Sequence, residues 1–232
     1  MIALNPKAQV RLNRVGRDAV PVLVIDDLCL DPDDLVAAAA AAGWAPPDGT
    51  FYPGLNAPLP PDYLPEIYAG LSRSLVRAFG EAFTGAMSAH GFFALATWRL
   101  ESFGPWQRIP HYDQPHPAHL AMVHYLGKGQ GGGTGFFRHD ATGYEWIDAG
   151  RREGYLSGVT DWIGRQGDQL STHAGPETPG YTMTDQVDFA FNRAVIYPSY
   201  ALHCALFDGA RLGADPRAGR LTANSFFYPA AA

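Results

Sequence analysis

The chain has 232 residues, of which 47% are hydrophobic and only 17% are charged, a composition that supports a folded core and excludes general disorder. The 17 basic and 23 acidic residues give a formal net charge of −6, so a broad basic surface is excluded and we expect no nucleic-acid partner. Glycine (26) and proline (19) are abundant without a collagen-like period, which indicates many turns.

The N-terminal part of the sequence predicts one strand and two helices. Residues 20–25 are continuous and largely β-branched, which is typical of a buried strand. A proline, two aspartates and an alanine run predict a helix from about 31 to 42. Residues 51–61 read as a loop. Apolar residues at spacings of three and four predict a second helix over 62–83.

From residue 92 the hydrophobic period changes to two, which is typical of strands. The expected strands are 93–100, 119–126, 135–138, 187–191, 194–197, 202–207 and 221–228. Helices followed by many short strands predict an α+β chain, mainly β, with an antiparallel sandwich or barrel. We expect a single domain over 1–232, with a helical N-terminal support in 1–90 and a β core in 91–228.

Between 140 and 181 the period is lost, and the segment is rich in Gly, Ser, Thr and Gln. A loop of this length inside a compact domain is often functional or carries some helix of its own. We interpret it as an insert that is either a lid beside a substrate or a structural extension, with a short helix over 151–166.

Cysteine usage and the N-terminus bear on the compartment. Cys29 and Cys204 are too few for a disulfide framework, and they indicate free thiols in a reducing compartment. Neither a signal peptide nor a membrane-spanning stretch is apparent, so we expect a cytoplasmic protein with no membrane partner.

His111 and Asp113 are the first residues that point to chemistry. On an extended segment, positions two apart face the same side about 6.5 Å apart, so an imidazole and a carboxylate can share one metal ion. Far downstream, His203 lies in an apolar strand, where an imidazole without a partner is costly.

A final strand carries Arg220 and Thr222 on one face. The guanidinium of an arginine can clamp a carboxylate through two hydrogen bonds, and a hydroxyl two residues away can add a third. Two histidines and one carboxylate leave open positions on iron(II), and an arginine nearby can hold the far carboxylate of a chelating keto acid.

This order of residues resembles the iron(II)/2-oxoglutarate-dependent dioxygenases. Residues 122–126 followed by 131–137, and residues 192–198 before His203, resemble the prolyl-hydroxylase-like branch and an uncharacterised bacterial family within it. The interval from His203 to Arg220 is longer than usual in the superfamily, and Thr222 stands where serine is commoner.

The resemblance implies a double-stranded β-helix, or jelly-roll, with the N-terminal helices packed on one sheet. It implies that His111, Asp113 and His203 bind Fe(II), and that 2-oxoglutarate chelates the metal. Arg220, Thr222 and Tyr125 would contact the keto acid. Because Asp113 is present, whereas related halogenases lack this carboxylate, hydroxylation of a C–H bond is favoured.

The substrate implied is a small molecule or an amino-acid or peptide side chain, and members of the superfamily often form homodimers. Two other hypotheses stay open: a cupin-type metalloenzyme that does not use 2-oxoglutarate, and a non-catalytic jelly-roll binding protein. The role of Arg220 distinguishes the cupin-type hypothesis from the leading hypothesis. Metal uptake distinguishes the binding-protein hypothesis from the leading one.

Overall fold

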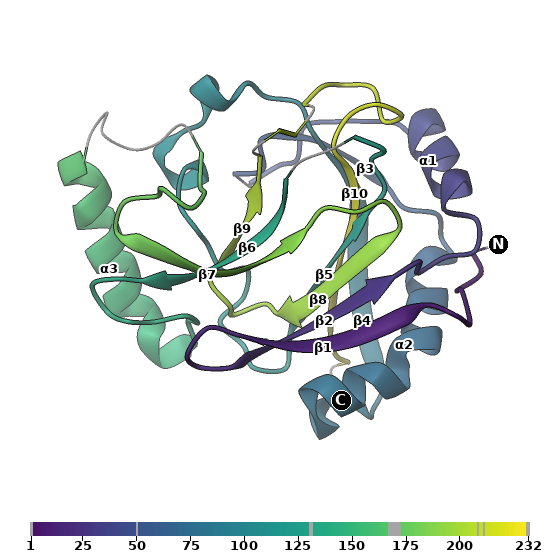
Figure 1. Ribbon diagram of the computed structural model, residues 1–232, viewed down its shortest axis with the longest axis horizontal. Coiled ribbons are helices and arrows are strands. Elements are labelled where there is room, and N and C mark those ends of the chain that lie inside the picture. Colours follow the sequence, from purple (N-terminus) through teal and green to yellow (C-terminus); the bar gives the residue numbers. More distant parts are fainter. Residues whose placement is uncertain are drawn as a thin grey trace.

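The computed structural model describes residues 2–49, 51–129, 132–166, 173–207, 209–210 and 212–230. Within this part, two antiparallel β-sheets and three α-helices form the molecule (Figure 1), so the predicted mainly β class is confirmed. Residues 167–172 of the expected insert and residue 131 of the glycine-rich stretch lie outside the described residues.

The larger sheet has seven strands, and every neighbouring pair is antiparallel. In spatial order the strands are β1 (Gln9–Val15), β2 (Val20–Asp26), β8 (Arg193–Pro198), β5 (Leu120–Tyr125), β10 (Leu221–Pro229), β4 (Met87–Ala96) and β3 (Gly54–Pro58).

The smaller sheet has three strands, in the order β7 (Tyr181–Asp188), β6 (Gly133–His139) and β9 (His203–Leu206). On the far side of β9, His111 forms an antiparallel bridge with His203 and extends this sheet by one residue pair.

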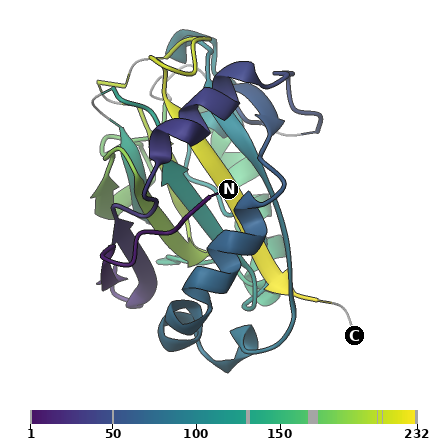
Figure 2. The same cartoon turned by 90° about the vertical axis from the view of Figure 1, so that its right-hand side faces the viewer.

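The helices lie on the outer faces of the two sheets. Helices α1 (Pro32–Ala41) and α2 (Tyr63–Phe79) cross one face of the larger sheet (Figure 2), where Leu35, Ile67 and Leu71 pack against strand residues in one buried cluster. Helix α3 (Ala149–Gln166) covers the smaller sheet, where Tyr155 and Val159 join residues of β6 and β9. Short 3-10 turns occur at Glu81–Phe83, Leu100–Ser102 and Pro105–Gln107.

The space between the two sheets is a second buried cluster. The larger sheet contributes Tyr125, Val195 and Tyr197, and the smaller sheet contributes Phe136 and Val187. Because side chains alternate along a strand, the face that meets the smaller sheet is the one opposite the helices α1 and α2. The candidate site lies in this interior.

Several sequence expectations need correction. Residues 1–90 are not only a helical support, because β1, β2 and β3 all join the larger sheet, and the expected loop at 51–61 contains β3. The helix predicted over 62–83 ends at Phe79, since Gly80 adopts a φ of 99° that a continued helix does not allow. The strand expected at 187–191 is β7, which ends at Asp188.

Both cysteines are buried, and Cys204 packs beside α3 on the outer face of the smaller sheet. Within the described ranges, no helix combines the length and apolar character needed to span a membrane.

Candidate metal centre

His111, Asp113 and His203 come together at the edge of the smaller sheet. The backbones of His111 and His203 exchange two hydrogen bonds of 2.8 Å, and the Asp113 N–H donates to the Ser199 carbonyl at 2.8 Å. One ligand atom from each of the three side chains lies within 4.8 Å of the other two. The Asp113 carboxylate is 3.7 Å from His111 Nε2 and 3.6 Å from His203 Nε2. The sequence therefore predicted a trio that the fold assembles.

The ring of His203 is fixed by its own backbone neighbourhood. Its Nδ1 lies 2.9 Å from the Ala201 carbonyl, which can only accept, so Nδ1 carries the proton. Nε2 is then left with a lone pair directed toward Asp113. This is the arrangement by which proteins orient a histidine that binds a metal.

Charge states at the trio suit metal binding. Burial lowers the pKa of His203 to about 4. Burial and the neighbouring His203 lower the pKa of His111, although 53% of the His111 side chain is exposed. Burial also raises the pKa of Asp113 to about 6, and His111 opposes that rise. At pH 7 both imidazoles are neutral and the carboxylate is ionised. Two neutral nitrogens and one carboxylate oxygen form a donor set that fits iron(II) and leaves coordination positions open.

Arg220 is the second notable group in this interior. Its side chain is 5% exposed, one guanidinium nitrogen donates to the Gly133 carbonyl at 3.1 Å, and the guanidinium carbon lies 5.4 Å from the centre of the Phe207 ring. Its Nε has no hydrogen-bond partner, and no carboxylate pairs with it among the residues that the structure describes. A buried cation without a counter-charge is costly, so the site favours an external anion.

The other two predicted contacts lie near Arg220. Thr222 is buried, and its hydroxyl donates a long hydrogen bond of 3.5 Å to the Ala94 carbonyl. The Tyr125 hydroxyl shares a 2.6 Å hydrogen bond with Thr134 of β6, which links the two sheets. Charge–charge interaction with Arg220 partly offsets the rise in the pKa of Tyr125 that burial causes.

Tyr197 is a site residue that the sequence did not identify. Its ring centre is 4.6 Å from that of His203, and its phenol interacts electrostatically with both Asp113 and Arg220. Tyr197 is therefore close to the trio and within electrostatic range of the arginine. In the sequence it looks like any aromatic residue of a buried strand.

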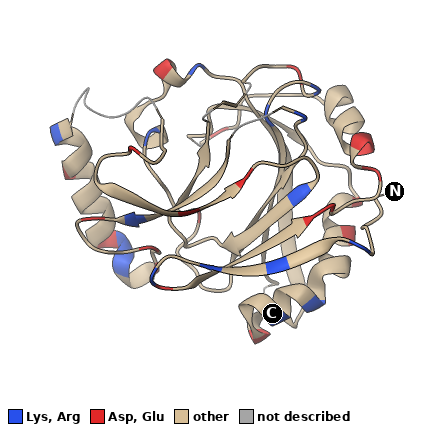
Figure 3. Ribbon diagram, in the orientation of Figure 1, with Lys and Arg blue, Asp and Glu red and all other residues tan. Residues whose placement is uncertain are grey.

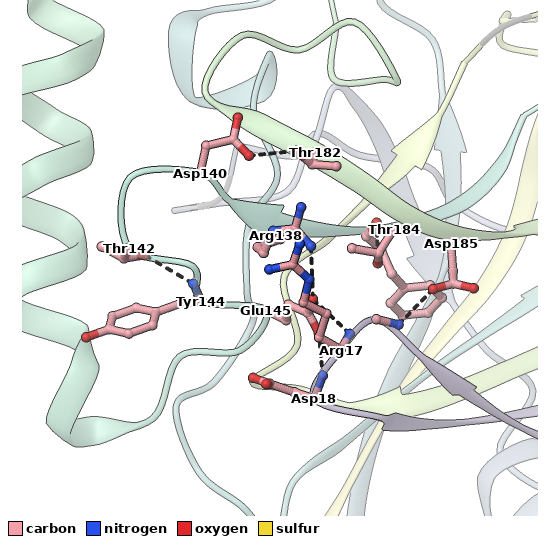
Figure 4. Close-up of polar contacts among 12 residues, drawn as sticks. Arg17, Asp18, Arg138, Asp140, Thr142, Tyr144, Glu145, Thr182, Thr184 and Asp185 are labelled. Carbon is pink, nitrogen blue, oxygen red and sulfur yellow. Dashed lines mark hydrogen bonds and ion pairs between the residues drawn. The ribbon is translucent and has the colours of Figure 1, made fainter.

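Glu145 is a second residue that sequence reasoning missed. Its buried carboxylate accepts hydrogen bonds from the backbone N–H groups of Arg17 at 3.0 Å and Asp18 at 2.9 Å, and lies 3.6 Å from Arg138 (Figure 4). The turn between β1 and β2 lies very close to Glu145. A Cβ on Gly16, which has a φ of 68°, would be 2.1 Å from the Glu145 carboxylate.

The backbone around Glu145 leads directly to the metal centre. The Glu145 carbonyl accepts from the N–H of Leu202 at 2.9 Å, and Trp146 forms a bridge with Ala201. The Ala201 carbonyl in turn orients His203. The β1–β2 turn therefore holds, through one buried carboxylate, the segment that positions a predicted metal ligand.

His124 and His139 lie apart from the trio. His124 is fully buried on the helix side of the larger sheet, between the Tyr63 hydroxyl at 3.0 Å and Asn192 at 3.2 Å. The ring of His139 contacts Tyr155 and Tyr181 beside α3.

Comparison with known proteins gives structural neighbours, HygX among them, and a family. HygX from Streptomyces hygroscopicus, whose crystal structure has nickel, 2-oxoglutarate and hygromycin B bound, is 11% identical, with a TM-score of 0.46 over 91% of this chain and 84% of HygX. No sequence among the curated proteins matches the chain. The profile of a family of unknown function, DUF6445, matches residues 6–227. The chain therefore belongs to the DUF6445 family.

Proposed function

We propose that this chain is a non-haem iron(II)- and 2-oxoglutarate-dependent oxygenase that hydroxylates a C–H bond of its substrate. His111, Asp113 and His203 would hold the iron. The reaction combines the substrate, O2 and 2-oxoglutarate to give the hydroxylated substrate, succinate and carbon dioxide.

The observation that carries this proposal is the buried Arg220 guanidinium, which shares the interior with the trio and has no carboxylate partner within the described ranges. A metal trio alone suits many reactions. A trio beside a buried cation suits a ligand that chelates a metal at one end and ends in a carboxylate at the other.

The strand order supports a finer assignment of the fold. Four central strands of the larger sheet follow the order β4-β10-β5-β8. Facing them are the His111 segment and then β9, β6 and β7. Two facing antiparallel sheets of four, linked by strands that cross from one to the other, are the arrangement of a jelly-roll, so we propose a double-stranded β-helix for this core.

Each residue has a separate role in the proposed mechanism. Iron(II) held by the trio would, together with 2-oxoglutarate, activate O2, which is the oxidant. Arg220 and Thr222 bind the distal carboxylate, and Tyr125 lies beside the bound keto acid. The neutral His203, oriented by the Ala201 carbonyl, presents its lone pair to the metal. Burial around these groups excludes water and strengthens their electrostatic interactions.

An anaerobic titration tests the proposal. Adding iron(II) and then 2-oxoglutarate should give a visible charge-transfer band, which His203→Ala should abolish. Gln114→Ala is the matched control, because this side chain beside Asp113 is exposed. Metal uptake without a band would favour a cupin-type enzyme that does not use 2-oxoglutarate. Folded protein that takes up no metal would favour a binding protein.

We propose that the substrate is a small molecule or an amino-acid or peptide side chain. Acidic and basic positions are interspersed along the ribbon (Figure 3). Together with the net charge of −6, this supports the expectation that nucleic acid is not bound.

A further inference from the structure

Six aromatic rings form a continuous row on the interior face of the larger sheet. Neighbouring ring centres are 4.6 to 6.3 Å apart. In order, this aromatic row consists of Phe92, Phe226, His90, Tyr228, His119 and His116. All six side chains are exposed or half-buried, so none is sealed inside a core.

Strand register places the aromatic row beside the metal centre. Phe226 of β10 pairs with Ala121 of β5, which pairs with Tyr197 of β8. Two strand spacings amount to about 10 Å. Since the Tyr197 ring contacts His203, the middle of the row lies within reach of a ligand whose other end is at the metal.

The row also lies away from the keto-acid end of the interior. Arg220 and Phe226 share one face of the final strand and are six residues apart, about 20 Å along the strand. A dicarboxylate held by Arg220 would therefore leave the row free for a different ligand.

The row is made of phenyl, phenol and imidazole rings. It contains no carboxylate, amine or guanidinium. Burial lowers the pKa of His90, and burial together with His116 and His90 lowers the pKa of His119, so the rings of His90 and His119 are neutral at pH 7. No hydrogen bond inside the described ranges uses the ring nitrogens of these two residues, which leaves polar edges for substituents of a ligand.

We propose that the aromatic row binds a planar aromatic ring of the substrate, which makes the substrate a small uncharged aromatic compound. The identification of this ligand as the substrate rests on the proposed function. Stacking against Phe226 and Tyr228 supplies the affinity, and the imidazole edges supply orientation. The bound ring would then extend from the row toward His111, Asp113 and His203.

Indole, a neutral planar probe, tests the proposal by ligand-observed NMR on the protein loaded anaerobically with iron(II) and 2-oxoglutarate. Phe226→Leu retains apolar area but removes the aromatic face, and should raise the Kd of indole about fivefold. His119→Ala should weaken binding similarly. Phe51→Leu, an exposed aromatic outside the row, should leave Kd unchanged. Cyclohexanol should bind more weakly than indole.

Thermal unfolding of each variant establishes that it is folded. The proposal is overturned when folded Phe226→Leu and His119→Ala bind indole as tightly as the Phe51→Leu control. Bound indole should also shift the charge-transfer band. Indole binding that depends on the row, in protein that gives no band, overturns the oxygenase assignment and with it the role of the ring as substrate.

Discussion

Replacing Arg220 should weaken 2-oxoglutarate binding while it raises the free energy of unfolding. Among the described residues, the buried guanidinium donates one hydrogen bond to the Gly133 carbonyl and contacts the Phe207 ring. Removing one partner of a buried, hydrogen-bonded charge pair costs about 2–5 kcal/mol. Arg220→Met should therefore raise the Kd of 2-oxoglutarate by about 30-fold to about 4,000-fold.

The same substitution should stabilise the protein that lacks ligand. Burying an unpaired cation costs several kcal/mol, against about 1.5–3 kcal/mol from its hydrogen bond and about 0.5–1 kcal/mol from its ring contact. A methionine of similar length removes the desolvation cost. We expect a net gain of about 1–3 kcal/mol in the free energy of unfolding, a rise in Tm of about 2–4 °C for each kcal/mol.

Arg193 is the matched control, because it pairs with Asp26 and donates to the Asp188 carbonyl at 2.8 Å. Arg193→Met should lower the free energy of unfolding by about 1–2 kcal/mol and leave the Kd of 2-oxoglutarate unchanged. Urea unfolding and anaerobic titration measure both quantities. An Arg220→Met chain that is destabilised as much as Arg193→Met and still binds 2-oxoglutarate normally would contradict both expectations.

Three further predictions follow from the same interior. Asp113 must be ionised to bind a metal, and its pKa is about 6. The iron(II) affinity, measured anaerobically, should therefore be constant above pH 7 and fall about tenfold per pH unit well below pH 6. Equal affinities at pH 5 and pH 7 would contradict this prediction. Glu145→Gln should lower the free energy of unfolding by about 1–3 kcal/mol, because the carboxylate that accepts two backbone N–H hydrogen bonds loses its charge. The same substitution should weaken iron(II) binding. Unchanged urea unfolding would exclude the proposed anchoring role. Tyr125→Phe and Thr222→Val should each raise the Kd of 2-oxoglutarate about threefold to tenfold without affecting iron(II) binding, and a Kd equal to that of the unsubstituted chain would remove that residue from the keto-acid contact.

Local patterns predicted the buried strands and both N-terminal helices. The edge strands were harder, because an edge strand carries one unpaired side and tolerates residues that a central strand excludes. In β3, Gly54 and Pro58 read as turn residues, and yet the strand pairs with β4 along five positions. In β7 the alternation is largely polar, since this strand forms the far edge of the smaller sheet.

The spacing of His111 and Asp113 placed both side chains on one side, but the sequence alone could not show which distant histidine meets them. Strand pairing decides this, and the reciprocal backbone bonds of His111 and His203 cross 92 positions of the chain. The sequence could not identify Glu145 either, because its partners are also distant in the chain. Its role depends on the turn at 16–18, more than 120 residues away, and no local motif records that contact.

The site is divided between the two sheets, and this division explains what Tyr125 and Glu145 do together. The larger sheet carries Arg220 and Tyr125, whereas the smaller sheet carries His203. The distance between the proposed metal centre and the proposed keto-acid anchor is therefore set by how the sheets are held against each other. The Tyr125–Thr134 hydrogen bond joins them directly, and Glu145 joins the β1–β2 turn to the segment before β9. Loosening either link should change the coupling between metal and keto acid more than the binding of either one alone.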